Sequence, residues 1–153
     1  MKRNIQFLLA GILFLCLACG GSNSDPDPEP EPTPQQKTTA LLTGGTGKWN
    51  PATLSNWVTV EGVNAVELFK DFTITFTATG YTTTGTTPVW PRSGTWRFKD
   101  QSSTVLIRES DNKEVTIESI NEITLRITLT WDETTYGGKT TSLGGKHEFN
   151  LTK

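Results

Sequence analysis

The longest alternation of apolar and polar residues in the chain, over residues 123–131, constrains the fold most strongly. Every second residue there is large and apolar, and the residues between them are threonine or arginine. Because successive side chains of a β-strand point to opposite faces, this pattern predicts a long strand with one face in a core. The apolar face is expected to consist of Ile123, Leu125, Ile127, Leu129 and Trp131.

A second alternation, over residues 72–79, predicts another half-buried strand with Phe72, Ile74, Phe76 and Ala78 facing inward. Threonine occurs 27 times, and because β-branched residues fit pleated surfaces, the domain is expected to be all-β. One helical turn is expected between Val63 and Asp71. A first strand is expected to begin at residues 47–49 and, after an interruption at Pro51, to resume over 57–60. Further strands are expected over residues 81–84, 94–98, 104–109, 115–117 and 147–151.

About eight strands therefore follow one another, joined mostly by short turns. Closing such a sheet into an up-and-down barrel removes its exposed edges, which otherwise invite aggregation. We therefore predict a small antiparallel barrel. A two-sheet β-sandwich would show the same alternation and stays open as the alternative fold.

The N-terminal segment, residues 1–18, has the pattern of an export signal. Lys2 and Arg3 precede an apolar run that is short for a membrane span and typical of a signal peptide. The junction Leu15-Cys16-Leu17-Ala18-Cys19 resembles a bacterial lipobox, although Cys16 stands where leucine is usual. This resemblance implies that Cys19 is the first residue of the mature protein and carries acyl chains such as palmitate, which anchor it to a membrane. Gly20 after the cysteine implies, by the same resemblance, sorting to the outer membrane.

Residues 19–37 are expected to form a disordered tether, and residues 38–153 the folded domain. Four acidic residues in the tether are each followed by proline, so the tether should be extended and solvated. An acidic stretch at this position resembles the surface-export signals of Bacteroidota lipoproteins, which would place the domain outside the cell. It is equally compatible with a plain spacer.

The composition disfavours several classes of function. Both cysteines lie in the export region and His147 is the only histidine, so no metal site and no catalytic triad are expected. We therefore predict a protein that is not an enzyme and carries no cofactor. From Thr38 onward, eleven basic and twelve acidic residues leave a net charge of −1, so nucleic acid is not an expected partner.

Aromatic side chains are the remaining candidates for ligand contact. Trp90 lies between two prolines in a loop, where its ring either folds back as a lid or is exposed as a binding platform. Tyr136, in a glycine-flanked loop, poses the same alternative. Trp96 and Trp131 lie on apolar strand faces that favour the core, and they would contact a ligand held inside a barrel.

Several segments together resemble lipocalins, and more specifically the lipocalin-like domains of small Bacteroidota surface lipoproteins. They are Gly47-Lys48-Trp49, Phe72-Thr73-Ile74-Thr75-Phe76, Pro88-Val89-Trp90-Pro91, Ser93-Gly94-Thr95-Trp96 and Thr134-Thr135-Tyr136-Gly137-Gly138. The resemblance implies a calycin-like barrel whose interior or mouth holds an apolar ligand. It also implies a basic residue packed on Trp49, for which Arg126 is a candidate.

The predicted function is that of a monomeric, non-enzymatic lipoprotein of the outer membrane, facing outward, that binds a small apolar or amphipathic ligand. The alternative is a scaffold or glycan-contact accessory subunit of a cell-envelope complex, without a ligand cavity. The bulk of the inward-facing aromatic residues slightly favours a filled interior, because small barrels have room for little more than side chains.

Overall fold

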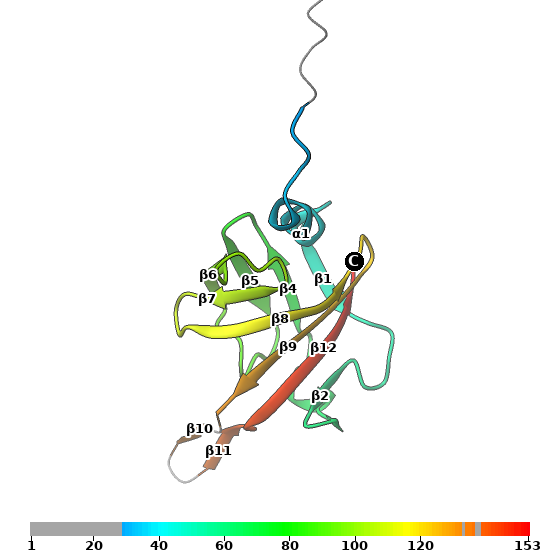
Figure 1. Cartoon of the computed structure of the whole chain (residues 1–153). Helices are drawn as coiled ribbons and strands as arrows, with labels where there is room; N and C mark the ends of the chain where they lie inside the picture. Colours follow the sequence, from blue (N-terminus) through cyan, green and yellow to red (C-terminus); the bar gives the residue numbers. More distant parts are fainter. Residues whose placement is uncertain (1–28, 133, 137–138) are drawn as a thin grey trace, which may run out of the picture. The chain divides into compact units, whose positions relative to one another are not determined.

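The computed structural model describes residues 29–132, 134–136 and 139–153, with no side chains described over 133–142. The chain divides into two units after Pro30, and the fold below is that of the second unit, Glu31–Lys153. It is a closed antiparallel barrel of eight strands with one short α-helix (Figure 1). The barrel strands are β1 (Lys48–Pro51), β4 (Thr73–Phe76), β5 (Gly80–Thr84), β6 (Ser93–Phe98), β7 (Val105–Arg108), β8 (Lys113–Ile120), β9 (Thr124–Trp131) and β12 (Gly145–Thr152).

The remaining elements are inserted between barrel strands. Between β1 and β4 lie β2 (Val58–Val60), β3 (Val63–Asn64) and the 3₁₀-helix η1 (Val66–Leu68). Between β9 and β12 lies a separate hairpin of β10 (Thr134–Tyr136) and β11 (Lys139–Ser142). The helical turn predicted between residues 63 and 71 is thus confirmed as η1.

Pairing of the first and last barrel strands closes the sheet. β1 pairs with β4 on one side and with β12 on the other, where Asn50 lies opposite Thr152 and Pro51 opposite Leu151. Neighbouring strands otherwise follow the chain order. The barrel prediction is confirmed, and the two-sheet sandwich is wrong.

The alternation that predicted β9 is confirmed in its middle and wrong at its start. Leu125, Ile127 and Leu129 are buried and Trp131 is partly buried, but Ile123 is 64% exposed. Ile123 precedes the strand, in the turn that Asn121 stabilises by accepting hydrogen bonds from two backbone amides. The alternation of apolar and polar residues in the sequence therefore begins one residue before the strand.

The strand predicted over residues 72–79 is shorter than expected. Phe72, Ile74 and Phe76 face the core, whereas Ala78 is exposed. β4 ends at Phe76 because the chain then turns, and the Thr77 amide donates to the Gly80 carbonyl at 2.8 Å.

The core-facing residues of β7 are Leu106 and Arg108. The sequence groups Val105 and Ile107 on one face of this strand, but Leu106 belongs to the core cluster and Arg108 on the same face is 1% exposed. Leu106 lies opposite Val115 of β8, which is also in the core. A charged residue consequently faces the inside of the barrel.

The helix α1 (Pro34–Thr43) begins within the segment expected to be tether. Thr33 caps it, since its side chain accepts from the Gln36 amide while the Gln36 side chain accepts from the Thr33 amide. Pro34 suits the first helical position, where no amide hydrogen is needed. Residues 34–37, which were expected to belong to the tether, are therefore helical.

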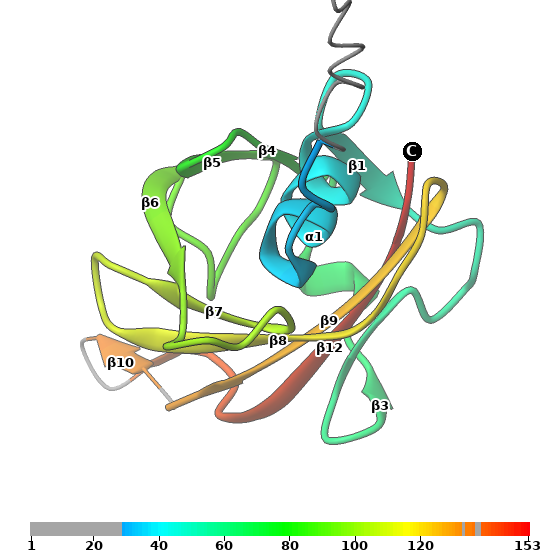
Figure 2. The same cartoon turned by 45° about the horizontal axis from the view of Figure 1, so that its top comes forward.

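The helix lies over one end of the barrel (Figure 2). Leu42 is fully buried, and its carbonyl accepts a hydrogen bond of 2.9 Å from the Trp49 indole. No helix among the described residues is long and apolar enough to cross a bilayer.

Candidate functional site

Aromatic rings fill the inside of the barrel. Trp57 stacks on Phe72 at 5.8 Å between ring centroids, and Phe149 lies 5.2 Å from Phe69 and 5.6 Å from Phe72. All four residues are buried. An eight-stranded barrel is just wide enough for side chains, so these rings occupy the space that a ligand would need.

A buried arginine organises the barrel end at which β9 stops, opposite α1 in Figure 1. The Arg108 guanidinium lies 4.9 Å from the centre of the Trp90 ring and 5.4 Å from that of Trp131. Such contacts stabilise a cation by the negative faces of the rings, and more strongly where water is excluded. Trp90 and Trp131, two of the four aromatic residues expected at the ligand site, thus both contact the Arg108 guanidinium.

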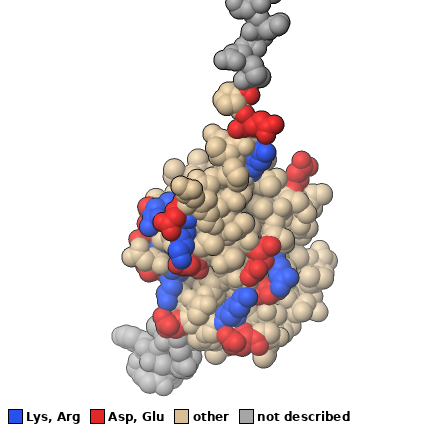
Figure 3. All heavy atoms as spheres, viewed as in Figure 1, with Lys and Arg blue, Asp and Glu red and all other residues tan. Residues whose placement is uncertain are grey.

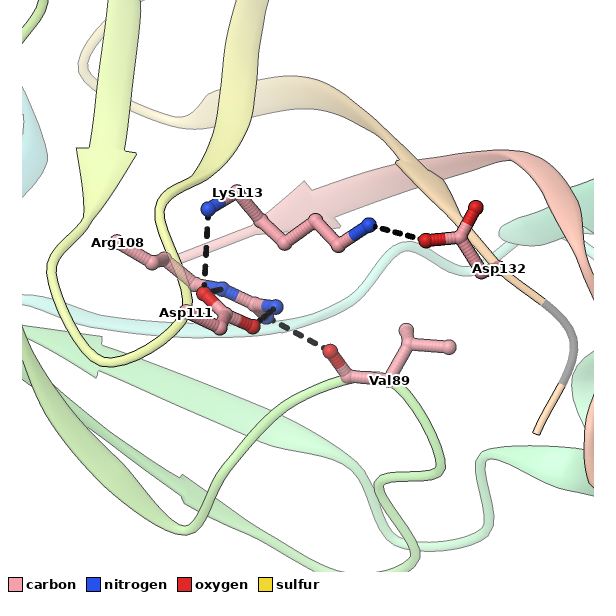
Figure 4. A network of polar contacts seen from close by, with 5 residues as sticks. All are labelled: Val89, Arg108, Asp111, Lys113 and Asp132. Atoms are coloured by element: carbon pink, nitrogen blue, oxygen red, sulfur yellow. Dashed lines mark hydrogen bonds and ion pairs between the residues drawn. The ribbon is translucent and has the colours of Figure 1, made fainter.

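The polar contacts of Arg108 join two loops, one through Val89 and one through Asp111 (Figure 4). Its Nη1 donates to the Val89 carbonyl at 2.7 Å, and its Nη2 and Nε donate to the two Asp111 carboxylate oxygens at 2.5 and 3.3 Å. Asp111 also accepts from the Lys113 amide at 3.2 Å, and the Lys113 ammonium pairs with Asp132 at 2.7 Å. The arginine is therefore paired and hydrogen-bonded, as burial of a charge requires.

Trp90 is folded back as a lid and is 3% exposed. Its ring meets Tyr81 at 5.4 Å and Phe149 at 6.2 Å. Among the described residues, the Trp90 indole nitrogen and the Tyr81 hydroxyl are the buried side-chain atoms without a hydrogen-bond partner. Burial raises the pKa of Tyr81, against the opposing charge of Arg108.

The other two aromatic candidates, Trp96 and Tyr136, do not belong to this cluster as the structure describes it. The Trp96 indole donates to the carbonyls of Thr77 and Gly80 and its ring packs on Phe98 at 5.3 Å, so it is a core residue. The side chain of Tyr136 lies outside the described part of the chain, and so does Cys19.

His147 is a buried wall residue, 1% exposed, rather than part of a polar constellation. Its Nδ1 lies 3.1 Å from the Gly145 carbonyl, and its ring packs against Phe69 and Phe149. Burial lowers the pKa of the imidazole, partly offset by the Gly145 carbonyl and the Glu61 carboxylate. The described residues contain no group of three or more potential metal ligands.

An open groove of about 710 Å³ runs beside α1. Three charged residues, Lys37, Lys153 and Glu122, are among those that line it. Lys153 donates to the Leu41 carbonyl at 2.8 Å and lies 4.5 Å above the Trp49 ring. The groove is lined by Lys37, Ala40, Leu41, Gly44, Gly45, Glu122 and Lys153.

Lys153 is thus the basic residue that packs on Trp49. The expected candidate, Arg126, instead pairs with Glu148 on the outer wall at 2.8 Å between Nη2 and Oε2. The expectation for Arg126 is wrong because its alternation places it on the outward face of β9, between the buried Leu125 and Ile127.

Most other charged side chains at the surface lie in pairs. On the face shown in Figure 3, basic and acidic side chains are neighbours. The ion pairs of the described residues include Lys99–Glu114 and Lys146–Glu118. None of the seven ion pairs formed by the described side chains includes Lys37, Lys153 or Glu122. The three charged residues that line the groove therefore lack ion-pair partners among the described side chains.

Two functional features were missed at the sequence level. The Thr33-Pro34-Gln35-Gln36 string is the signature of a capping box and could have revealed α1. Arg108 had no such signal, because residues 105–107 are apolar on both faces of β7 and hide the alternation.

Comparisons with known proteins give no relative from which a function could be transferred. No family model matches the chain, and no curated protein or solved structure matches it.

Proposed function

We propose that this chain is a lipid-anchored protein of the outer membrane that binds a small amphipathic molecule and carries out no chemistry on it. The observation that supports binding most directly is the open groove of about 710 Å³ beside α1. Its volume lies within the range of roughly 300–1,000 Å³ that is typical of small-molecule sites. Its apolar lining and charged rim suit a ligand with both kinds of surface.

The filled interior moves the proposed site from inside the barrel to its outside. A ligand between Trp57, Phe72 and Phe149 would have to displace rings whose centroids lie 5.6 to 6.5 Å apart. Opening a close-packed core costs several kcal/mol, whereas the groove is already open. The binding site therefore differs from the barrel interior that the lipocalin resemblance implies.

Two features favour the lipocalin-like relationship itself. The closed eight-stranded barrel has the expected architecture. Trp49, in the first strand, is covered by the basic residue Lys153, as the resemblance implies for its signature tryptophan. In this proposal the groove lies where that tryptophan is covered.

The proposed anchor is Cys19, whose acyl chains would hold the domain on the membrane by hydrophobic burial. Residues 20–30 then act as the tether. At about 3 Å per residue in an extended proline-rich chain, it would hold the barrel some tens of ångströms from the bilayer, facing outward.

A glycan-contact accessory role is the second candidate, and a second groove favours it. This groove, of about 720 Å³, lies on another side of α1 and brings threonine and glutamine side chains beside Trp96 and Phe98. Several of its polar groups are already used within the chain, as for Gln35, which donates to the carbonyls of Asp100 and Ser102. Fewer groups remain free for a sugar, so we place this function second.

Native mass spectrometry of the mature chain with Cys19→Ala tests the proposal. The protein should retain a single-chain amphiphile from the expression host or bind an added one with one-to-one stoichiometry. Binding of oligosaccharides but of no amphiphile would contradict the proposal and favour the accessory role. Labelling of the unmodified chain with an acyl probe, compared with Cys19→Ala, tests the anchor independently.

A further inference from the structure

We propose that the ligand of the α1 groove is an anionic single-chain amphiphile, whose carboxylate pairs with Lys153 and Lys37. This inference rests on the proposed function and specifies the chemistry of its ligand. Three features support it: the Lys153 ammonium is held in place, neither lysine has an ion-pair partner among the described residues, and small residues line the groove.

Lys153 is held in place before any ligand arrives. Its Nζ donates to the Leu41 carbonyl at 2.8 Å and lies 4.5 Å over the ring of the fully buried Trp49. An ammonium has three N–H donors, so the bond to Leu41 leaves donors for another acceptor. Because the group is already oriented, an arriving anion loses less of its binding free energy to the ordering of a flexible side chain.

Both ammonium groups lack an ion-pair partner. Lys37 and Lys153 are in none of the ion pairs among the described residues, although most other basic side chains there are paired. Glu122 lines the same groove and is also outside these pairs. Two ammonium groups without an ion-pair partner thus belong to the lining residues and complement an anion, whereas the Glu122 carboxylate opposes it.

Small residues make the floor accessible to a hydrocarbon chain. Ala40, Leu41, Gly44 and Gly45 present apolar or backbone surface with few polar side-chain atoms. A Cβ atom at Gly44 would come within 3.2 Å of the Lys153 ammonium and 2.9 Å of the Ala40 carbonyl. Glycine at position 44 therefore lets the lysine reach the groove rim beside α1.

The concave shape favours one free molecule over a membrane surface. A groove of about 710 Å³ can enclose one chain, whereas a bilayer meets a protein at broad, exposed apolar faces. The exposed large apolar residues of the described chain are few, and only Ile123 directly follows a groove residue, Glu122. A carboxylate amphiphile such as dodecanoate is thus a suitable probe.

Isothermal titration of the mature chain carrying Cys19→Ala tests the inference, with probes of equal chain length and below their micelle concentrations. Dodecanoate should bind roughly five- to tenfold more tightly than dodecanol, as expected for one partly exposed charge-assisted contact. Dodecyltrimethylammonium should bind most weakly. In Lys153→Gln and Lys37→Gln the preference for dodecanoate should shrink, while Lys48→Gln, an exposed lysine outside the groove, should keep it.

Glu122→Gln is a second variant that leaves the packing on Trp49 intact. Removing its charge should tighten dodecanoate binding several-fold and leave dodecanol binding unchanged. Equal binding of dodecanoate and dodecanol by the parent chain would overturn the anionic preference while leaving the proposed function standing. Binding only to phosphatidylglycerol vesicles, with none to the monomeric probes, would overturn both the single-molecule ligand and the proposed small-molecule site. Absence of binding to every probe would contradict the proposed function itself.

Discussion

Single residues in this barrel show how strongly burial decides the role of a charge. Arg108 and Arg126 both pair with a carboxylate, yet Arg108 is almost fully buried while the Arg126 side chain is 50% exposed. A pair that water reaches contributes little, because water competes for both charges. A buried pair must keep all its partners, because a charge left alone is poorly solvated.

Replacing Arg108 with alanine should lower the free energy of unfolding by about 3 kcal/mol. The change removes the contacts to Val89 and Asp111 and leaves a gap beside the Trp90 ring. Urea unfolding followed by tryptophan fluorescence measures this loss. The matched change Arg126→Ala should cost less than about 1 kcal/mol, and equal losses in the two variants would contradict the structural role of Arg108.

His147 should make the stability of the domain depend on pH below neutrality. Its pKa is lowered in the folded state from the usual 6.5, so the unfolded chain binds more protons as the pH falls below that value. The free energy of unfolding should stay constant above about pH 7 and decrease below about 6.5, by at most about 1.4 kcal/mol per pH unit.

The His147→Gln variant separates this effect from other titrations. It should show a flatter stability profile between pH 5 and the ordinary histidine pKa of about 6.5. Glu148, whose pKa is lowered by its bond to Arg126, contributes only as the pH falls below the usual carboxylate range near 4.5. An unchanged slope in His147→Gln would show that another group titrates in this window.

The burial of a residue could be predicted from the sequence where apolar and polar residues alternate. It could not be predicted where this alternation is absent. Leu125, Ile127 and Leu129 follow a strict period of two and are buried as expected. Arg108 and Lys153 acquire their surroundings from distant segments, as when Trp49 and Leu41 surround Lys153. No local pattern encodes such contacts.

At the scale of elements, α1 lies over one end of the barrel and forms one wall of the proposed site. Only Thr38 and Leu42 of the helix are buried. An isolated helix of ten residues is marginal in water, so its capping and its few core contacts must maintain it. The start of α1 was not predicted, because proline and acidic residues dominate the composition up to Thr33 and obscure the capping box there.

Removal of the cap should loosen this helix. Thr33→Ala deletes the acceptor for the Gln36 amide and should lower the free energy of unfolding, or of local opening of α1, by about 1 kcal/mol. Thr39→Ala is the matched control, because the Thr39 hydroxyl bonds only to the Gln35 carbonyl of its own helix. Amide hydrogen exchange over α1 measures both, and equal protection in Thr33→Ala and the parent chain would contradict the capping role.

For the whole molecule, closure depends on a short contact. β9 and β12 pair over eight residue positions, whereas β1 and β12 pair over two.

The number of strands and the up-and-down order could be predicted from regular alternation and short turns. The filled interior could be anticipated only from the bulk of the inward-facing side chains, because its packing depends on contacts such as Phe69 with Phe149 that join distant segments.

Hydrogen exchange should follow this distribution of pairing. Amides of β9 and β12 should exchange most slowly, whereas those of β2 and β3, which are short and lie at a sheet end, should exchange faster. Mass spectrometry of peptic fragments resolves these segments. Uniform protection of all strands would show that the barrel opens only as one cooperative unit.

The most direct test of the account is to map by NMR where an amphiphile binds the mature chain with Cys19→Ala. On titration with dodecanoate, amide shifts should concentrate at residues 37–45, around Glu122 and at Lys153, with the barrel interior unchanged. Shifts concentrated instead at inward-facing residues such as Leu129 and Phe149 would show that the ligand enters the barrel. That result would contradict the claim that a filled barrel binds its ligand in the groove beside α1.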